Sequence, residues 1–252
     1  VFGGDGVDRL FTNRLEPAAH PFYAQIQGLR VSAHLFLRRD GTLIQYVPLH
    51  RRAWHAGAAC WAGETDINSR SIGIELVNRG HAWGYHPFPD SQLESLRGLL
   101  AEVMQRHTIP PERVLGHSDV APARKIDPGE LLPWRWLADQ GLAVWPVPVE
   151  SPVETPGIAW FQDGLAAVGY CVPRSHTLDD ATANVLTAFQ RRFRPAAVTG
   201  APDTETAARL RGLLARVEVT HRDRPERVFD LLPDADEVTE LCTCVRAEVA
   251  LW

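Results

Sequence analysis

Residues 116–129 read Gly116-His117-Ser118-Asp119-Val120-Ala121-Pro122-Ala123-Arg124-Lys125-Ile126-Asp127-Pro128-Gly129. This segment gathers an imidazole, a carboxylate and an ammonium group in a stretch that two prolines keep from continuing as a helix. Metal-binding and catalytic groups usually lie on such loops, and His117 and Asp127 are both of types that bind zinc. A histidine beside an acid is also common as a purely structural pair, so the residues alone predict a functional loop and leave its metal open.

Glu75 is the second candidate, because it interrupts an apolar run. Residues 71–77 read Ser-Ile-Gly-Ile-Glu-Leu-Val, which is apolar enough for a central strand of a sheet. A carboxylate there is costly to bury unless it faces a polar cavity or a partner. Strand alternation places Glu75 on the face opposite Ile74 and Leu76. The alternative is the solvated face of an edge strand.

The remaining patterns predict an α/β protein with a mixed central sheet flanked by helices, and a small three-helix C-terminal domain. Asp40-Gly41 lies between two runs of strand-forming residues and predicts a hairpin. Apolar residues at helical spacing predict a helix over 93–104, which Asp90 or Ser91 would cap. Short helical patterns follow at about 158–168, 178–193 and 203–215.

A proline-rich stretch divides the chain. We expect a catalytic domain over residues 1–145, a linker over 146–157 and a helical module over 158–216. The sheet should then take no strand from beyond residue 160. Residues 217–252 are weakly patterned and remain unassigned.

Composition excludes several classes of function. The chain has 252 residues with a formal net charge of -5, which argues against a nucleic-acid or anionic-membrane partner. No run of 18 apolar residues predicts a membrane span. The four cysteines do not form a dense disulfide framework. Cys242 and Cys244 supply only two of the four ligands of a structural metal site, so incidental thiols are the alternative, and the cysteines leave the compartment open.

Several ordered motifs together resemble the zinc N-acetylmuramoyl-L-alanine amidases that share the peptidoglycan recognition protein fold. The resemblance covers roughly residues 1–146. Besides Gly116–Pro122 and Arg124–Gly129, the matching stretches are Arg30–His34, Arg38–Gly41, Gln45–Pro48, Ala53–Gly57 and Asn68 with Ser71–Leu76.

The resemblance implies a zinc ion held by His117 and Asp127. It gives Glu75 the role of catalytic acid and base, and Lys125 that of the cation beside the metal. The family's third zinc ligand is a histidine at the end of a first strand, which we expect upstream of Val1. His34 and His55 are the internal alternatives by type, although the family motifs contain both without using them as ligands.

Residues 158–216 resemble a peptidoglycan-binding three-helix module, on Leu165, Gly169-Tyr170, Ala188-Phe189-Gln190, Thr199-Gly200, Asp203, Thr206 and Leu210. The alternative is a generic helical appendage. The whole chain is thus predicted to hydrolyse the amide between N-acetylmuramic acid and L-alanine in peptidoglycan or muropeptides. A non-catalytic muropeptide-binding protein is the alternative. The wall-binding module favours the periplasm or cell envelope over the cytoplasm, and the oligomeric state stays open.

Overall fold

The computed structural model describes residues 5–19, 21–26, 28–223 and 242–246. A five-stranded mixed sheet lies at its centre, with the strand order β2-β1-β3-β5-β4. β1 and β2 pair antiparallel, and every other neighbouring pair is parallel. The strands are β1 (Leu35–Leu37), β2 (Leu43–Gln45), β3 (Ser71–Leu76), β4 (Val114–Gly116) and β5 (Cys242–Arg246). The predicted class, a mixed sheet flanked by helices, is therefore confirmed.

The predicted hairpin forms at Asp40-Gly41. Gly41 has a φ of +90°, a conformation that favours glycine, and a Cβ there would lie 2.7 Å from the Ser95 hydroxyl oxygen. The hairpin therefore turns tightly against helix α3. Its strands are short, Leu35–Leu37 and Leu43–Gln45.

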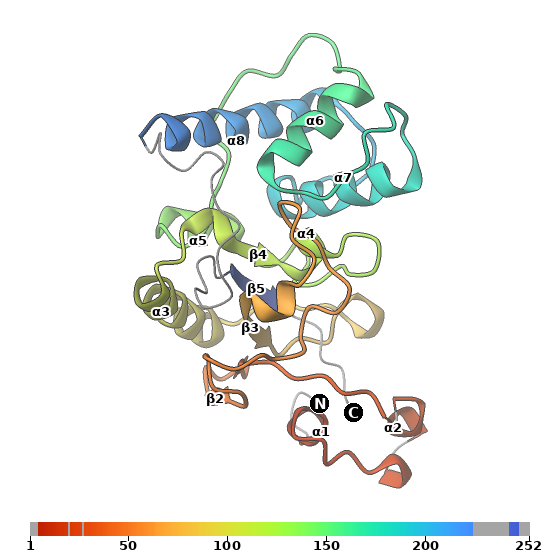
Figure 1. The fold of residues 1–252 in the computed structure, drawn as a ribbon, viewed down its shortest axis with the longest axis vertical. Coiled ribbons are helices and arrows are strands. Elements are labelled where there is room, and N and C mark those ends of the chain that lie inside the picture. The colour runs from red at the N-terminus through yellow and green to blue at the C-terminus, as the bar shows by residue number, and fades with distance from the viewer. Residues whose placement is uncertain (1–4, 20, 27, 224–241, 247–252) are drawn as a thin grey trace, which may run out of the picture.

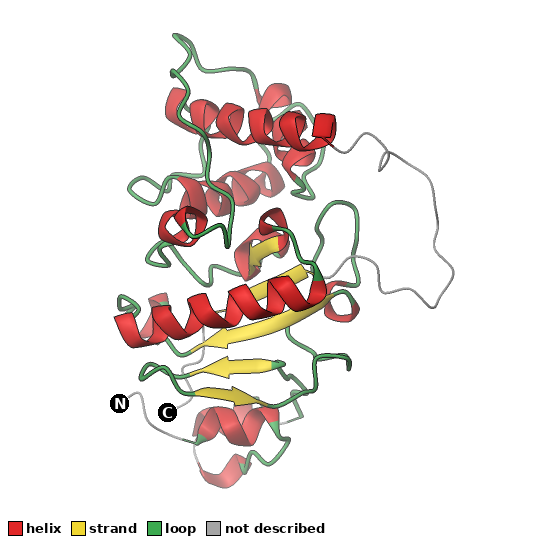
Figure 2. Cartoon of the chain, turned by 90° about the vertical axis from the view of Figure 1, so that its left-hand side faces the viewer, coloured by secondary structure: helices red, strands yellow, loops and turns green. Residues whose placement is uncertain are grey.

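Helix α3 (Asp90–His107) covers one face of the sheet, as Figure 2 shows. Leu96, Leu100 and Val103 of this helix pack with Ile72, Ile74 and Leu76 of β3 in one buried cluster. The predicted side-chain cap is wrong: Pro89 takes the N-cap position, and the Ser91 hydroxyl donates to the Arg39 carbonyl instead.

The chain begins with short helical elements that the sequence patterns did not predict, α1 (Gly6–Phe11), η1 (Pro17–Ala19) and α2 (Pro21–Gln25). The first of them, α1, packs against the opposite face of the sheet at β1. Phe11 of α1 meets Phe36 of β1 edge-on, with ring centroids 6.2 Å apart. Asp8 accepts hydrogen bonds from Tyr46 and Arg38, which fasten α1 to the hairpin.

The C-terminal helices gather at one end of the molecule, as Figure 1 shows. They are α6 (Ile158–Val168), α7 (Asp180–Phe193) and α8 (Thr204–Asp223). Asp179 caps α7 by accepting from the Thr182 amide at 2.8 Å, and Asp203 accepts from the Thr206 amide at 2.7 Å at the start of α8. The predicted start of α8 at Asp203 is thus confirmed.

The helical module shares its core with the sheet domain. Phe161, Phe189 and Leu210 of the module belong to one buried cluster with Leu115 and Val120 of the region around β4. The remaining described elements are η2 (Ile67–Ser69), η3 (His81–Trp83), η4 (Pro111–Arg113), α4 (His117–Val120) and α5 (Trp134–Asp139). The proposed domain boundaries stay a prediction, but the two parts pack as neighbours.

The expectation that the sheet takes no strand from beyond residue 160 is wrong. β5 lies between β3 and β4 and pairs parallel with both. The strand follows a long weakly patterned segment, so no local sequence pattern predicted it. Of the rest of the unassigned tail, residues 217–223 continue helix α8, and residues 224–241 and 247–252 lie outside the described residues. Within the described ranges, no helix has the length and apolar character needed to cross a membrane.

Candidate active site

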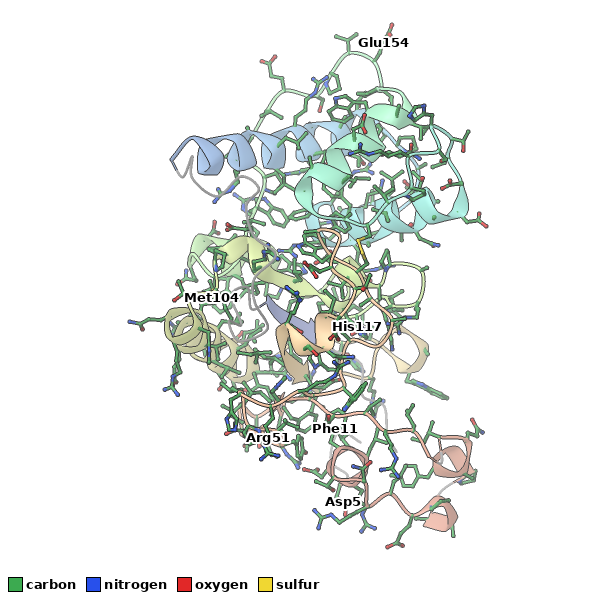
Figure 3. All side chains as sticks on the ribbon, viewed as in Figure 1. Asp5, Phe11, Arg51, Met104, His117 and Glu154 are labelled. Carbon is green, nitrogen blue, oxygen red and sulfur yellow. A yellow bond between two sulfur atoms is a disulfide. The ribbon has the colours of Figure 1, made fainter. Side chains whose placement is uncertain are left out.

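His117 lies where strand β4 passes directly into helix α4. Gly116 ends the strand, and His117 begins one short helical turn. The Asp119 carboxylate accepts from the Gly116 amide at 2.8 Å, which fixes this junction. His117 itself is only 1% exposed, and Figure 3 shows it in the middle of the molecule, between the N-terminal helices and the C-terminal module.

Asp127 meets His117 at the far end of the same loop. The imidazole Nδ1 lies 3.1 Å from Asp127 Oδ2, and the Asp127 side chain is also 1% exposed. A backbone bond from the Ser118 amide to the Asp127 carbonyl, 2.8 Å long, closes the loop on itself. The two residues to which the resemblance assigns the zinc are therefore in contact, and their role as metal ligands stays a prediction.

A backbone carbonyl orients the imidazole from the other side. His117 Nε2 lies 3.0 Å from the Ala56 carbonyl oxygen, which can only accept. Nε2 must therefore carry the proton, and the lone pair of a neutral imidazole sits on Nδ1, toward Asp127. Arg124 donates to the carbonyls of Ala56 and Ala58 and so holds the supporting segment in place.

Glu75 lies on the face of the sheet that the segment around Ala56 covers. β3 is an interior strand, so the edge-strand alternative is wrong, and the Glu75 side chain is 0% exposed. A Cβ on Gly73, two residues earlier, would lie 2.4 Å from the ring of His55, so this segment packs against that face. Because side chains alternate, Glu75 shares the face with Gly73, while Ile74 faces α3. The catalytic role of Glu75 stays a prediction.

Lys125 lies between the two candidate ligands in the loop. Its side chain is partly buried, and its backbone amide donates to the Ala121 carbonyl at 3.0 Å. This places the residue on the same loop as His117 and Asp127. Its role as the cation beside a metal likewise stays a prediction.

The internal histidines have structural partners. His34 accepts from the Gly73 amide at Nδ1 and donates from Nε2 to the Arg51 carbonyl, at 3.0 and 2.8 Å. Burial lowers the pKa of His34 from its ordinary value, because it disfavours the charged imidazole. His55 Nε2 lies 2.8 Å from the Ser71 hydroxyl, which itself donates to Ile67. No group of three or more His, Cys, Asp or Glu residues in the described part of the chain could hold a metal ion.

Comparisons with known proteins decide the family. Residues 6–130 match the family model for N-acetylmuramoyl-L-alanine amidase. The chain is 38% identical over 188 residues to the N-acetylmuramoyl-L-alanine amidase AmiD of Escherichia coli (strain K12), which is 68% of this chain and 67% of that protein. The chain belongs to the N-acetylmuramoyl-L-alanine amidase family.

Further matches agree with this family. The chain is 43% identical over 133 residues to the 1,6-anhydro-N-acetylmuramyl-L-alanine amidase AmpD of Enterobacter cloacae, which is 53% of this chain and 69% of that protein. The solved complex of AmiD from E. coli with anhydro-N-acetylmuramic acid-L-Ala-D-gamma-Glu-L-Lys matches with a TM-score of 0.69 and 36% identity, covering 77% of this chain and 82% of that one. The predictions of the fold and of an enzyme are thereby confirmed.

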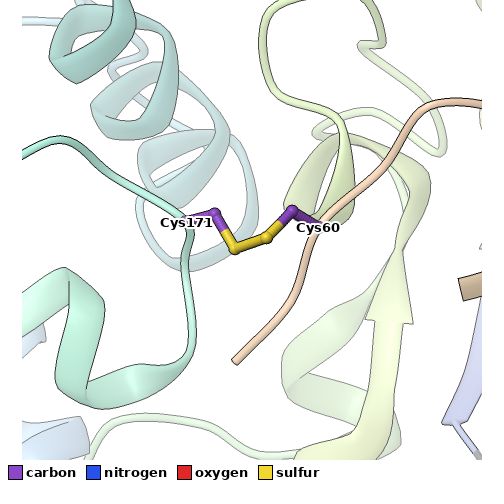
Figure 4. The surroundings of a disulfide bond; sticks show 2 residues. All are labelled: Cys60 and Cys171. Carbon is purple, nitrogen blue, oxygen red and sulfur yellow. A yellow bond between two sulfur atoms is a disulfide. The ribbon is translucent and has the colours of Figure 1, made fainter. Parts of the chain in front are cut away.

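The helical module of this amidase also has a family match. Residues 154–210 match a putative peptidoglycan binding domain, which confirms the resemblance drawn from the sequence. A disulfide between Cys60 and Cys171 joins this module to the segment that carries Ala56, as Figure 4 shows. The sequence does not predict this bond, because pairing of cysteines 111 residues apart cannot be deduced from spacing.

Two further residues of the module reach the loop of His117: Tyr170, which the sequence indicated only as a motif residue of the module, and Arg192, which no sequence pattern indicated. Tyr170 donates to Asp119 Oδ1 at 2.7 Å, and Arg192 donates to Asp119 Oδ2 at 2.6 Å. Both are buried, at 3% exposure each. Burial and the neighbouring carboxylate of Asp119 raise the pKa of Tyr170 well above its ordinary value, so the hydroxyl stays protonated and donates.

Proposed function

We propose that this chain is a zinc-dependent amidase that hydrolyses the bond between N-acetylmuramic acid and L-alanine in muropeptides or peptidoglycan. The observation that supports zinc binding is the contact between His117 and Asp127. Because the Ala56 carbonyl takes the Nε2 proton, the Nδ1 lone pair of a neutral imidazole faces a carboxylate oxygen at 3.1 Å. Two electron-rich atoms at this distance repel each other unless a cation or a proton lies between them.

The donor types suit zinc. Imidazole nitrogen and carboxylate oxygen are both ordinary zinc ligands, and a carbonyl that binds the second ring nitrogen is the usual support for a ligating histidine. His117 and Asp127 would therefore be two of the three protein ligands that a catalytic zinc site uses. The third, expected on a histidine upstream of Val1, stays a prediction.

The chemistry of Glu75 and Lys125 suits amide hydrolysis. Zinc, when bound, lowers the pKa of a coordinated water to about 7 and polarises a carbonyl group. Glu75 would accept a proton from the attacking water and return it to the departing amine of L-alanine. Lys125 would stabilise the negative charge that develops on the carbonyl oxygen. Burial of Glu75 keeps competing bulk water away from this proton transfer.

The substrate class follows from the relatives. AmiD of E. coli has been solved with an anhydro-muropeptide as its substrate, and the AmpD relative is named for the 1,6-anhydro sugar. The peptidoglycan-binding match over residues 154–210 supports contact with wall material as well. We therefore propose that both soluble anhydro-muropeptides and wall fragments are substrates.

The disulfide supports a location outside the cytoplasm. Disulfides form and persist in oxidising compartments such as the periplasm and are rare in the cytosol. The bond between Cys60 and Cys171 joins two segments that also pack through Trp61 and Tyr170, whose ring centroids lie 4.9 Å apart. We therefore propose the periplasm or cell envelope.

Zinc binding tests the proposal directly. The zinc content of the protein after equilibrium dialysis should be measured for the parent, His117→Gln and Asp127→Asn. His50→Gln is a matched control, because His50 is exposed and lies outside the loop. Zinc should be lost from the two loop variants and retained by the control. Equal zinc in the parent and both loop variants would show that the metal is not bound at this pair.

A further inference from the structure

Helix α7 of the peptidoglycan-binding module contacts the loop of His117 through a buried ion pair. Arg192 Nη1 lies 2.6 Å from Asp119 Oδ2, and the two side chains are 3% and 1% exposed. The same carboxylate accepts from the Gly116 amide and from the Tyr170 hydroxyl. Asp119 thus joins the backbone next to His117 to two side chains of the module.

The second guanidinium nitrogen of Arg192 holds the strand that precedes His117. Nη2 donates to the Val114 carbonyl of β4 at 3.0 Å. The guanidinium also lies over the ring of Trp134, with its carbon 4.0 Å from the ring centroid. One side chain of the module therefore fixes β4 and α4 together, on both sides of the backbone junction at Gly116.

The neighbouring arginine reaches the other end of the same loop. Arg191 Nε lies 3.7 Å from Glu130 Oε2, and this carboxylate also binds His81 Nε2 at 2.9 Å. Glu130 follows Asp127 by three residues. Successive arginines of α7 thus contact the segment before His117 and the segment after Asp127.

The disulfide between Cys60 and Cys171 also holds the module against the sheet domain, at the segment that carries Ala56. The Ala62 amide donates to the Gly169 carbonyl at 2.7 Å, beside the disulfide between Cys60 and Cys171. This places Tyr170 against Asp119 and also ties down the segment whose Ala56 carbonyl orients His117.

We propose that the module is a positioning element of the active site, in which Arg192 and Tyr170 hold Asp119 and thereby fix the loop that carries His117 and Asp127. This proposal rests on the proposed function for its catalytic consequence. It goes beyond wall attachment, because it predicts that hydrolysis of a soluble muropeptide depends on the docked module. Removing Arg192 leaves a buried carboxylate without its cation, which frees the Gly116 junction to move.

The test compares Arg192→Met and Tyr170→Phe in the full chain. Arg209→Met is the matched control, since Arg209 lies in the same module and pairs with Glu205 at the surface. Amide hydrogen exchange of Gly116 and Ser118 should quicken about tenfold or more in Arg192→Met, while exchange in α3 stays unchanged. On a soluble muropeptide, kcat should fall about tenfold or more with KM within about twofold, as is typical for supporting contacts around a metal. The control should match the parent in both measurements.

The outcomes are separable. Exchange and kcat within about twofold of the parent in Arg192→Met would overturn the proposal. If Arg192→Met unfolds throughout, Tyr170→Phe decides, because it removes one hydroxyl only: faster exchange confined to residues 114–130 supports the proposal, and unchanged exchange overturns it. A parent that does not cleave muropeptide would refute the proposed function, while the exchange measurement would still decide the positioning role.

Discussion

Breaking the disulfide between Cys60 and Cys171 should destabilise the whole molecule. The bond closes a loop across a separation of 111 residues, and the chain-entropy relation gives about 4.8 kcal/mol for a loop of this size. Measured losses for native disulfides are about 2–5 kcal/mol, so we expect the free energy of unfolding to fall by an amount in that range. Because the sheet domain and the module share one core, the loss should appear in a single transition.

Urea unfolding followed by tryptophan fluorescence measures this loss. The parent should be compared with and without a phosphine reductant, which avoids the zinc binding of thiol reductants, and with Cys60→Ser/Cys171→Ser. The reductant should lower the parent to the stability of the double variant and leave the double variant unchanged. A parent whose free energy of unfolding shifts by less than about 0.5 kcal/mol on reduction would refute the reasoning, because loop closure of this size cannot contribute so little.

Further predictions concern His34 and two glycines. Burial lowers the pKa of His34 below 6.5, so between that lowered value and 6.5 the unfolded chain binds more protons and stability falls as the pH falls. His34 should lower the free energy of unfolding by at most about 1.4 kcal/mol for each pH unit in this range. This pH dependence should be absent from His34→Gln. Equal slopes of stability against pH in the parent and in His34→Gln would contradict the prediction. Gly73→Ala should cost about 1–3 kcal/mol in the free energy of unfolding, because its Cβ would lie 2.4 Å from the ring of His55. Gly98 lies on the exposed side in the middle of α3, and a Cβ added there would meet no atom of another segment within 4 Å. Gly98→Ala should therefore raise the free energy of unfolding by about 0.5–1 kcal/mol. Equal effects at Gly73 and Gly98 would contradict the steric explanation.

Local sequence patterns predicted the elements whose formation depends on residues close to one another along the chain. Apolar spacing predicted α3, and Asp203 marked the start of α8, because periodicity and capping act within a few residues. The loop of His117 and Asp127 was also predictable, since its two prolines and its polar residues lie within one short segment. Glu75 was conspicuous as a carboxylate within an apolar strand.

Features that depend on distant pairing could not be predicted. β5 joins the sheet through pairing with β3 and β4, and no turn signal near it indicates those partners. Arg192 lies in the last turn of α7, where a basic residue is ordinary because it complements the helix dipole. Only the docked module shows that this arginine is buried against Asp119.

We propose that this chain cleaves the bond between the lactyl group and L-alanine with the buried carboxylate of Glu75. Mass spectrometry of an anhydro-muropeptide incubated with the protein and added zinc tests it most directly, with Glu75→Gln as the matched variant of the same size. The parent should give two products, the anhydro sugar and a free peptide that begins with L-alanine, and Glu75→Gln should leave the substrate intact. Cleavage elsewhere in the peptide, or equal rates for the parent and Glu75→Gln, would contradict it.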